Sequence, residues 1–220
     1  MMAFGTLYTH NPSPRVFAIL AVAKAHGLEL EVVQADKQDG ANYEQLLKIN
    51  PLGQVPTFVG ADGFVLTECI PIALYITSRS DTTTLLGRNQ REYYQVLQWM
   101  SLANSELLPA IGGVILPLIG RHQKVRMNNN DCMRSFYTVC KRLENHLKSS
   151  KYLVGEEVTL ADLFTVGAML FAVRMFHGIL TVDYPRLISW FHEVHDMPIL
   201  KAVLGEFQII DVPMPTLEEQ

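Results

Sequence analysis

The strongest constraint on the fold of this 220-residue chain is a change of hydrophobic pattern near residue 80. Before that point, short β-prone runs alternate with short apolar helical runs, and prolines or glycines stand between them. After it, apolar residues recur at spacings of three and four, which is typical of amphipathic helices. The polar stretch 78–91 lies between the two patterns and predicts a linker. We therefore expect two domains, residues 1–82 and residues 88–220.

The first domain is predicted to follow the order βαβ and then ββα. Pro14 suits the first turn of a helix because its missing N–H would be unpaired there, and Gly27 provides a left-handed stop. A turn at residues 61–63 joins two β-prone runs into a hairpin. The predicted strands are 6–9, 28–33, 52–59 and 64–67, and the predicted helices are 15–26, 43–49 and 68–76.

The second domain is predicted to be all helical. Thr159 and Asp162 have the spacing of a capping box at the start of the most apolar helix, so we expect Asp162 to reach back to the helix start. Such a box stabilises the fold and has no catalytic role. Cys132 and Cys140 are predicted to be packed thiols. The predicted helices cover 93–111, 131–147, 159–176, 184–196 and 198–204.

The charge balance and the cysteine content argue against several classes of function. The chain has 18 Lys and Arg against 22 Asp and Glu, a balance that disfavours an electrostatic nucleic-acid binder. Three cysteines without CxxC spacing form neither a zinc site nor a disulfide framework, and they fit a reducing compartment. The longest uncharged apolar runs, 107–120 and 163–173, are shorter than the ~18–20 residues that cross a bilayer. With no secretory signal visible, we expect a cytoplasmic protein without membrane or nucleic-acid partners.

Two histidines invite a metal hypothesis that their spacing does not favour. His192 and His195 stand three residues apart on a predicted amphipathic helix. The zincin pattern needs histidines four residues apart together with a later ligand. We therefore expect a solvated helix face here and no metal site.

Three segments of the first domain carry groups that suit a charged, peptide-like ligand. The loop with Asn11 and Ser13 precedes a helix, where donors and backbone N–H groups stabilise an anion such as a thiolate. Another predicted helix begins at Glu68, so the free N–H groups of its first turn suit a carboxylate while Glu68 beside them suits an amine. A cis bond at Val55-Pro56 would free the backbone of Val55 to pair with an extended ligand. Each segment alone also fits an ordinary turn, helix cap or strand start, so the hypothesis depends on their convergence.

At these spacings the three segments resemble the glutathione-binding half of the cytosolic glutathione transferases. The runs that carry the likeness are NPSP at 11–14 before Arg15, LGQVPTF at 52–58 and LTECI at 66–70. VGEEVTLADL at 154–163 resembles the helical-domain hallmark of the same family. The chain is also similar to the transferase-like N-terminal part of fungal elongation factor one-gamma, through GTLYT at 5–9, VGADGFVLTECI at 59–70, TLLG at 84–87 and WMSLANSE at 99–106. The resemblance spans nearly the whole chain.

The resemblance implies a thioredoxin-like α/β domain, an all-α domain, and a homodimer that binds glutathione. The γ-glutamyl end of the tripeptide would lie at Glu68, and its glycine end would lie near Gln54. Many members have Ser where Cys69 stands and Lys where Gln54 stands, so a hydroxyl donor and a charge are lost here. The residues expected to bind glutathione are Arg15, Gln54, Val55, Pro56, Glu68 and Cys69.

The residue that activates the thiol stays open between two candidates. In serine-type members the hydroxyl commonly sits four residues before the arginine, which is the place of Asn11 in this chain. Ser13 sits only two residues before Arg15. We rank Ser13 and Asn11 together as catalytic candidates, with Tyr8 behind them because its place within a strand favours sheet packing.

The resemblance also implies the activity, which is addition of the glutathione thiolate to an electrophilic and largely apolar small molecule. Detoxification and fungal secondary metabolism are the settings it suggests. The second substrate would contact a wall formed by the helical domain. Candidates for this wall are Trp99, Met100, Asn104, Ser105, Leu108 and the stretch around Phe207.

Two alternatives to conjugation stay open. Reversible addition of the thiolate to an activated double bond would permit rotation and elimination, which is glutathione-assisted cis/trans isomerisation. A non-catalytic scaffold domain of the translation elongation factor one complex is the other alternative. It predicts a longer chain with a Lys-rich linker, and the sequence ends at Gln220 without one, which we take to favour the enzyme.

Overall fold

A four-stranded sheet forms the centre of the first domain in the computed structural model, which describes residues 3–121 and 129–215. Strand β1 (Gly5–Thr9) pairs in parallel with β2 (Leu30–Gln34) and antiparallel with β3 (Thr57–Gly60). Strand β4 (Val65–Thr67) pairs antiparallel with β3, and the resulting order is β2-β1-β3-β4. This arrangement confirms the predicted βαβ–ββα topology.

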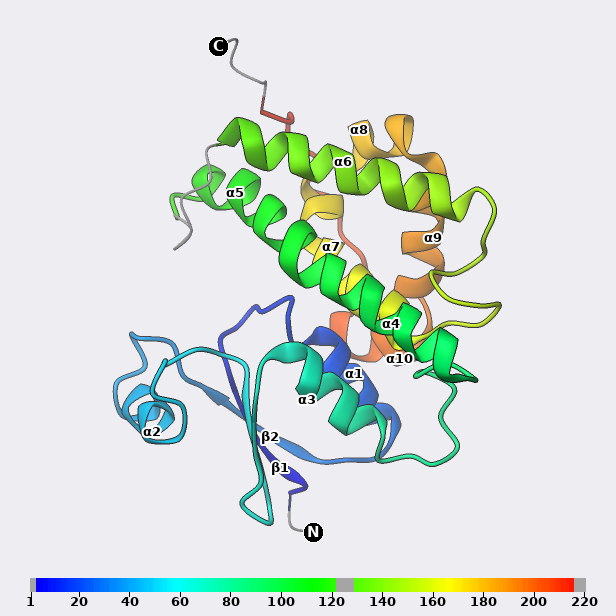
Figure 1. Ribbon diagram of the computed structural model, residues 1–220. Helices are drawn as coiled ribbons and strands as arrows, with labels where there is room; N and C mark the ends of the chain where they lie inside the picture. The colour runs from blue at the N-terminus through cyan, green and yellow to red at the C-terminus, as the bar shows by residue number, and fades with distance from the viewer. Residues whose placement is uncertain (1–2, 122–128, 216–220) are drawn as a thin grey trace.

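Two helices of the first domain lie between its sheet and the second domain (Figure 1). They are α1 (Phe17–Ala25) and α3 (Cys69–Thr77), which pack against each other. Their apolar residues, such as Ile19 and Ile72, join Phe58 of the sheet in one buried core. The third helix, α2 (Ala41–Ile49), lies away from the second domain and buries only Leu46.

Several element boundaries differ from the sequence-based prediction, and two of the differences have clear local reasons. The first helix begins at Phe17 rather than at residue 15, because a turn in which the Val16 N–H donates to the Ser13 carbonyl precedes it. Strand β3 begins at Thr57 rather than at residue 52. The residues before it form a loop held by the buried side chain of Asn50, which the apolar pattern did not reveal.

The second domain is all helical, as predicted, with α7 at its centre (Figure 1). Thirteen residues of α7 are buried, which explains why its sequence is apolar on every side. A π-helical segment (η1) and the seven-residue α8 were not predicted from the sequence. The elements are α4 (Gln90–Leu102), η1 (Ala103–Leu107), α5 (Leu108–Leu118), α6 (Asn129–Leu147), α7 (Leu160–Met175), α8 (His177–Asp183), α9 (Pro185–His195) and α10 (Pro198–Leu204).

The continuous helical stretch Gln90–Leu118 is long and apolar enough, by length and composition, to span a bilayer. Its apolar residues, however, belong to the core of the second domain, where Met100, Leu107 and Ala110 are fully buried. Burial inside the protein accounts for the apolar character of these positions.

Several predictions about buried groups in the second domain are confirmed. Cys132 and Cys140 are buried free thiols. The Asp162 carboxylate accepts the Thr159 backbone N–H at 2.9 Å, which closes the predicted capping box. Asp162 also accepts the Leu153 N–H and the Trp190 Nε1–H, at 2.9 and 3.1 Å, so it ties three separate parts of the domain together.

The two domains meet along α1. A Cβ on Gly167 of α7 would lie only 3.3 Å from the Phe17 Cβ, so glycine permits the close approach of the two helices. At the other end of α1, Lys24 Nζ donates to the Ala202 carbonyl of α10 at 3.0 Å. This packing brings the start of α1 close to the π-helical segment of the second domain, where Arg15 and Asn104 are in contact.

Candidate active site

The start of α3 has an unusual backbone and exposes an acidic side chain. Glu68, the residue before Cys69, has φ 70° and ψ 136°, a backbone conformation that residues other than glycine rarely adopt. Its side chain is exposed and forms no hydrogen bond or ion pair among the described residues. Strained backbone of this kind clusters at ligand sites. The start of α3 therefore presents a carboxylate without a partner among the described residues, beside first-turn backbone N–H groups that have no acceptor within the helix.

The loop before β3 contains the predicted cis bond, Val55-Pro56. The ladder between β3 and β4 begins only at Thr57, so Val55 lies outside the sheet pairing. Asn50 fixes this loop because its Nδ2 amide donates to the Gln54 carbonyl and to Thr57 Oγ1, both at 3.1 Å. The side chain of Gln54 is exposed, and Pro56 is buried. Asn50 is thus a positioning residue that the sequence analysis missed.

The Cys69 thiol lies at the first turn of α3 and is almost fully buried. Burial raises the pKa of this thiol to about 11, although the nearby Arg15 charge and the backbone N–H groups of Cys69 and Ile70 lower it. At neutral pH Cys69 is therefore a neutral thiol, and it donates to Asn104 Oδ1 at 3.4 Å. It is a lining group and not a nucleophile.

Arg15 carries a positive charge that no carboxylate neutralises within the described residues. Its side chain is half-buried, and its Nε–H donates to Asn104 Oδ1 at 3.3 Å. A partly buried charge without a counter-charge is costly, and an anionic ligand would offset that cost. Arg15, the cis loop and the start of α3 together form what we call the slot.

The three candidates for thiol activation occupy different environments. Asn11 is exposed and lies in a second cis bond, Asn11-Pro12, which the sequence analysis did not predict. Ser13 is buried, and its hydroxyl forms no hydrogen bond with another described residue. Tyr8 is buried in a small cluster with Leu46, and burial raises its pKa, so its placement is that of a packed strand residue.

The candidates for the substrate wall do not gather in one place. Trp99 packs against His146 of α6, with 4.8 Å between the two ring centroids, and α6 lies farther from the first domain than α4 does (Figure 1). Met100 is fully buried in the core, and Leu108 is nearly so. Ser105 is exposed and donates to the Ser101 carbonyl. Asn104 alone of this group contacts residues of the slot.

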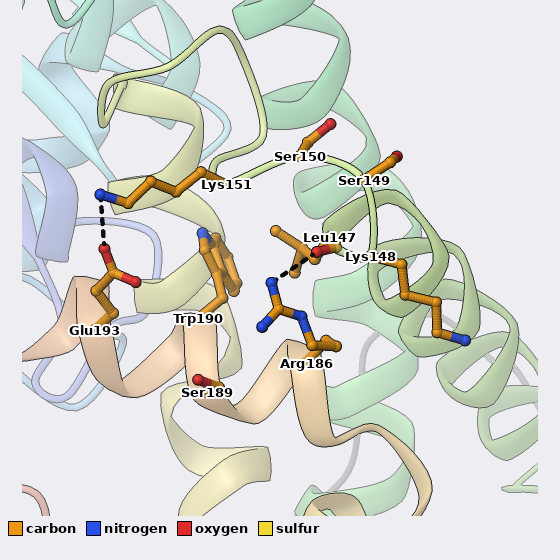
Figure 2. Close-up of a pocket in the computed structure, with 9 residues that line it drawn as sticks. All are labelled: Leu147, Lys148, Ser149, Ser150, Lys151, Arg186, Ser189, Trp190 and Glu193. Atoms are coloured by element: carbon orange, nitrogen blue, oxygen red, sulfur yellow. Dashed lines mark hydrogen bonds and ion pairs between the residues drawn. The ribbon is translucent and has the colours of Figure 1, made fainter.

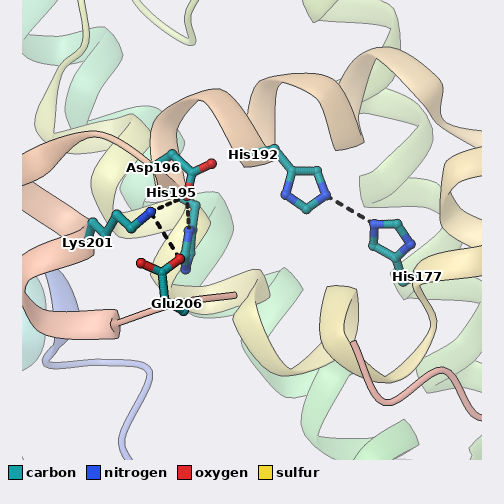
Figure 3. A network of polar contacts seen from close by, with 6 residues as sticks. All are labelled: His177, His192, His195, Asp196, Lys201 and Glu206. Atoms are coloured by element: carbon teal, nitrogen blue, oxygen red, sulfur yellow. Dashed lines mark hydrogen bonds and ion pairs between the residues drawn. The ribbon is translucent and has the colours of Figure 1, made fainter. Parts of the chain in front are cut away.

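Phe207 and the two histidines belong to a separate cluster, and Figure 3 shows the polar contacts of its histidines. His195 is fully buried, which corrects the expectation of a solvated helix face. Phe207 contributes to the burial because it lies against His192 and His195, with ring centroids 4.9 and 5.4 Å away, and Phe191 stacks on His195 as well. The Nε2 atoms of His192 and His177 lie 3.0 Å apart. Phe207 therefore belongs to this cluster and not to the slot.

Two cavities lie away from the slot. One, with a volume of about 290 Å³, opens between the turn after α6 and the face of α9 that carries Arg186 and Trp190 (Figure 2). A smaller one, of about 100 Å³, lies beside Arg88 and Glu92. The larger cavity lies within the second domain, the smaller one extends to Thr84 of the linker, and neither includes a residue of the slot. In residues 3–121 and 129–215, no group of three His, Cys, Asp or Glu side chains has metal-binding geometry.

Two family models match this chain. The model for "Glutathione S-transferase, N-terminal domain" matches residues 3–78, and the model for "Glutathione S-transferase, C-terminal domain" matches residues 108–198. The first match contains every residue of the slot that belongs to the first domain. Together the two matches cover more than half of the chain.

Relatives and solved structures agree with the family models. The chain is 45% identical to "Glutathione S-transferase mdpJ" of Emericella nidulans, over 93% of this chain and 92% of that protein. The GST-like domain of elongation factor 1-gamma from Saccharomyces cerevisiae matches with a TM-score of 0.80 at 31% identity, over 97% and 99% of the two chains. The glutathione transferase URE2P6 from Phanerochaete chrysosporium, solved with oxidized glutathione, shares the fold with a TM-score of 0.80 at 22% identity, over 92% and 95%. This chain therefore belongs to the glutathione S-transferase family, whose co-substrate is glutathione.

Proposed function

We propose that this transferase binds glutathione in the slot and adds its thiolate to an electrophilic, largely apolar small molecule. The observation that carries the proposal is the unneutralised, half-buried guanidinium of Arg15 beside the start of α3. A cation in that place lowers the pKa of a neighbouring thiol, as it does for Cys69. The glutathione sulfur next to Arg15 would gain the same stabilisation.

Glutathione would be held at both ends by groups that have no other partner. The free carboxylate of Glu68 suits the amine of the γ-glutamyl end, and the first N–H groups of α3 suit its carboxylate. The exposed Gln54 side chain would donate to the carboxylate of the glycine end. The backbone of Val55, outside the sheet pairing, would pair with the cysteinyl residue as an added strand.

In the reaction, the thiol of bound glutathione loses its proton to solvent and the sulfur attacks an electrophilic carbon. The new C–S bond forms as a leaving group departs, or the attacked double bond takes up a proton. Ser13 and Asn11 are the candidates to donate a hydrogen bond to the thiolate, since both precede α1. Ser13 is favoured because its hydroxyl forms no hydrogen bond within the described residues and could donate to the sulfur. Asn11 is favoured because its side chain is exposed, where a ligand could reach it.

Calorimetric titration with glutathione and a conjugation assay over a panel of electrophiles test the proposal. We expect heat of binding, and turnover with at least one activated aryl halide or unsaturated carbonyl compound. Arg15→Ala should raise the Kd of glutathione and lower the rate of conjugation, each by at least about tenfold. A change of that size corresponds to the free energy of one charge-assisted hydrogen bond. Absence of glutathione binding by the wild-type protein would refute the proposal.

Conjugation and isomerisation share the first step and differ in the fate of the adduct. If the adduct loses glutathione after rotation about the former double bond, the protein isomerises its substrate and consumes no glutathione. Counting glutathione consumed per product formed distinguishes the two. The 45% identity to a fungal transferase supports a substrate from fungal small-molecule metabolism.

A scaffold role is the second candidate, favoured by the likeness to the GST-like domain of yeast elongation factor 1-gamma. Glutathione binding without turnover of any electrophile would favour it. We also infer a homodimer, which light scattering after size exclusion tests, and a cytoplasmic location, which its three unpaired thiols support.

A further inference from the structure

Asn104 joins the two domains through a single oxygen atom. It lies in the π-helical segment η1 of the second domain and is half-buried. Its Oδ1 accepts the Nε–H of Arg15 at 3.3 Å and the Sγ–H of Cys69 at 3.4 Å. Single π-helical turns within helices occur frequently at functional sites. The sequence predicts Asn104 in the substrate wall, whereas its contacts are with Arg15 and Cys69.

These two contacts define the orientation of the amide. Both partners are donors, since the guanidinium has no acceptor and the neutral thiol offers its proton, so the carbonyl oxygen must face them. The Nδ2 group then points elsewhere, and it donates to no described residue. Asn104 therefore presents a free N–H donor from the same position that anchors Arg15.

The tether also leaves the charge of Arg15 intact. Hydrogen bonding through Nε limits the rotation of the guanidinium and leaves both Nη groups without a partner among the described residues. Because the amide of Asn104 is neutral, the tether orients the cation without neutralising it. An aspartate in the same place would accept the same hydrogen bond and cancel much of the charge.

We propose that Asn104 is a positioning residue that aims the uncompensated guanidinium of Arg15 at the sulfur of bound glutathione. This inference rests on the proposed function. It assigns to the second domain a part in thiol activation, in addition to any contact with the second substrate.

The test compares Asn104→Asp, Asn104→Ala and the wild-type protein through the pKa of the bound glutathione thiol. That pKa is read from the ultraviolet absorbance of the thiolate as a function of pH. We expect Asn104→Asp, which is nearly isosteric, to raise it by about 1 unit or more. Asn104→Ala should raise it by less, because the charge stays and only its orientation is lost. In the Arg15→Ala background, Asn104→Asp should have a much smaller effect, because the two residues act as one unit.

Asn145→Asp is the matched control, since Asn145 is exposed on α6 and its Oδ1 accepts a hydrogen bond from Lys148 Nζ. It adds the same charge and should leave the thiol pKa unchanged. If wild-type protein binds no glutathione, the proposed function fails. If it binds and lowers the thiol pKa, but Asn104→Asp and Asn104→Ala leave that pKa at the wild-type value, the inference about Asn104 is overturned. Circular dichroism checks the fold of each variant, and Asn104→Asp decides the outcome if Asn104→Ala does not fold.

Discussion

Two helix starts in this molecule satisfy their backbone groups in opposite ways. At the start of α7, the Asp162 carboxylate accepts the Thr159 N–H and hydroxyl, the Leu153 N–H and the Trp190 indole N–H. At the start of α3, the preceding Glu68 forms no such contact and has a strained backbone. One start is closed and fully hydrogen-bonded, whereas the other is open.

The difference between the two helix starts indicates different roles, because one contributes to the stability of the fold and the other is available to bind a ligand. Burial raises the pKa of Asp162, and its four hydrogen bonds oppose that shift. The free-energy cost of keeping this buried carboxylate ionised is therefore small only while all four donors are present. The start of α3 keeps its donors for a ligand, and the protein tolerates the strain there. Changes at the first start should therefore affect stability, and changes at the second should affect glutathione binding.

The largest expected effect is that of Asp162→Ala. The change leaves the Leu153 N–H, the Thr159 N–H and the Trp190 Nε1–H without their acceptor in a buried place. At about 1–3 kcal/mol for each buried unsatisfied donor, the free energy of unfolding should fall by at least about 3 kcal/mol. Urea denaturation measures the loss.

Asp162→Asn is the companion variant, because it keeps the shape and one acceptor oxygen and should lose less. The Kd of glutathione for both variants, measured where they are folded, should stay at the wild-type value. A change in Kd comparable to that of a slot variant would show that the two helix starts are not separate in function.

Glu68→Gly should have the next largest effect and should move stability and binding in opposite directions. Glycine accepts φ 70° without strain, so the free energy of unfolding should rise by about 1 kcal/mol. Loss of the carboxylate should weaken glutathione binding at least about tenfold. Thermal unfolding and calorimetric titration of the same sample measure the two effects.

Glu68→Gln separates the backbone from the charge. It keeps the strain and the side-chain length, so its stability should equal that of the wild type while its glutathione affinity still falls. Equal losses of stability in both variants would contradict the view that the start of α3 is strained for the sake of a ligand.

The sequence was sufficient for the topology because each element carries its own local signal. Pro14, Gly27 and the turn at residues 61–63 delimit the elements of the first domain, and the structure has them in the predicted order. The closed start of α7 was predictable for the same reason, since a capping box is a contact between residues three apart.

Properties that depend on contacts between distant residues were not predictable. His195 is in contact with Phe207, which lies twelve positions later in a segment without regular structure. The contacts of Asn104 depend on the rotation of a long helix through its π-helical turn, which brings it to Arg15 89 positions away. The same unknown rotation explains why Trp99 was assigned to the substrate wall and lies against α6.

The histidine cluster under Phe207 is intermediate between the two helix starts, because its polar groups are buried but only partly paired. Burial, and then the neighbouring His177, hold the pKa of His192 below its ordinary value of 6.5. The unfolded chain therefore binds this proton more readily than the folded one. Stability should be complete above that ordinary value and should fall as the pH drops below it.

The expected loss of stability at acid pH is smaller than the effects of Asp162→Ala and Glu68→Gly. His192→Gln removes the titrating group, so its melting temperature should fall less than that of the wild type between about pH 8 and about pH 5. His146→Gln is the control, since His146 belongs to a different contact, with the carbonyl of Tyr152. Parallel acid losses in the wild type and His192→Gln would place the sensitive group elsewhere.

Cys69→Ser should produce the smallest effect and tests how the open helix start receives its ligand. Because burial raises the pKa of Cys69 to about 11, this thiol should react no faster with a disulfide reagent at neutral pH than the buried Cys132 and Cys140. The hydroxyl is a stronger donor than the thiol, so glutathione affinity should rise about threefold in the variant. If glutathione affinity fell instead, the contact of Cys69 Sγ with Asn104 would contribute more to binding than donation to the ligand does. The start of α3 would then depend on Asn104 of the second domain for its position.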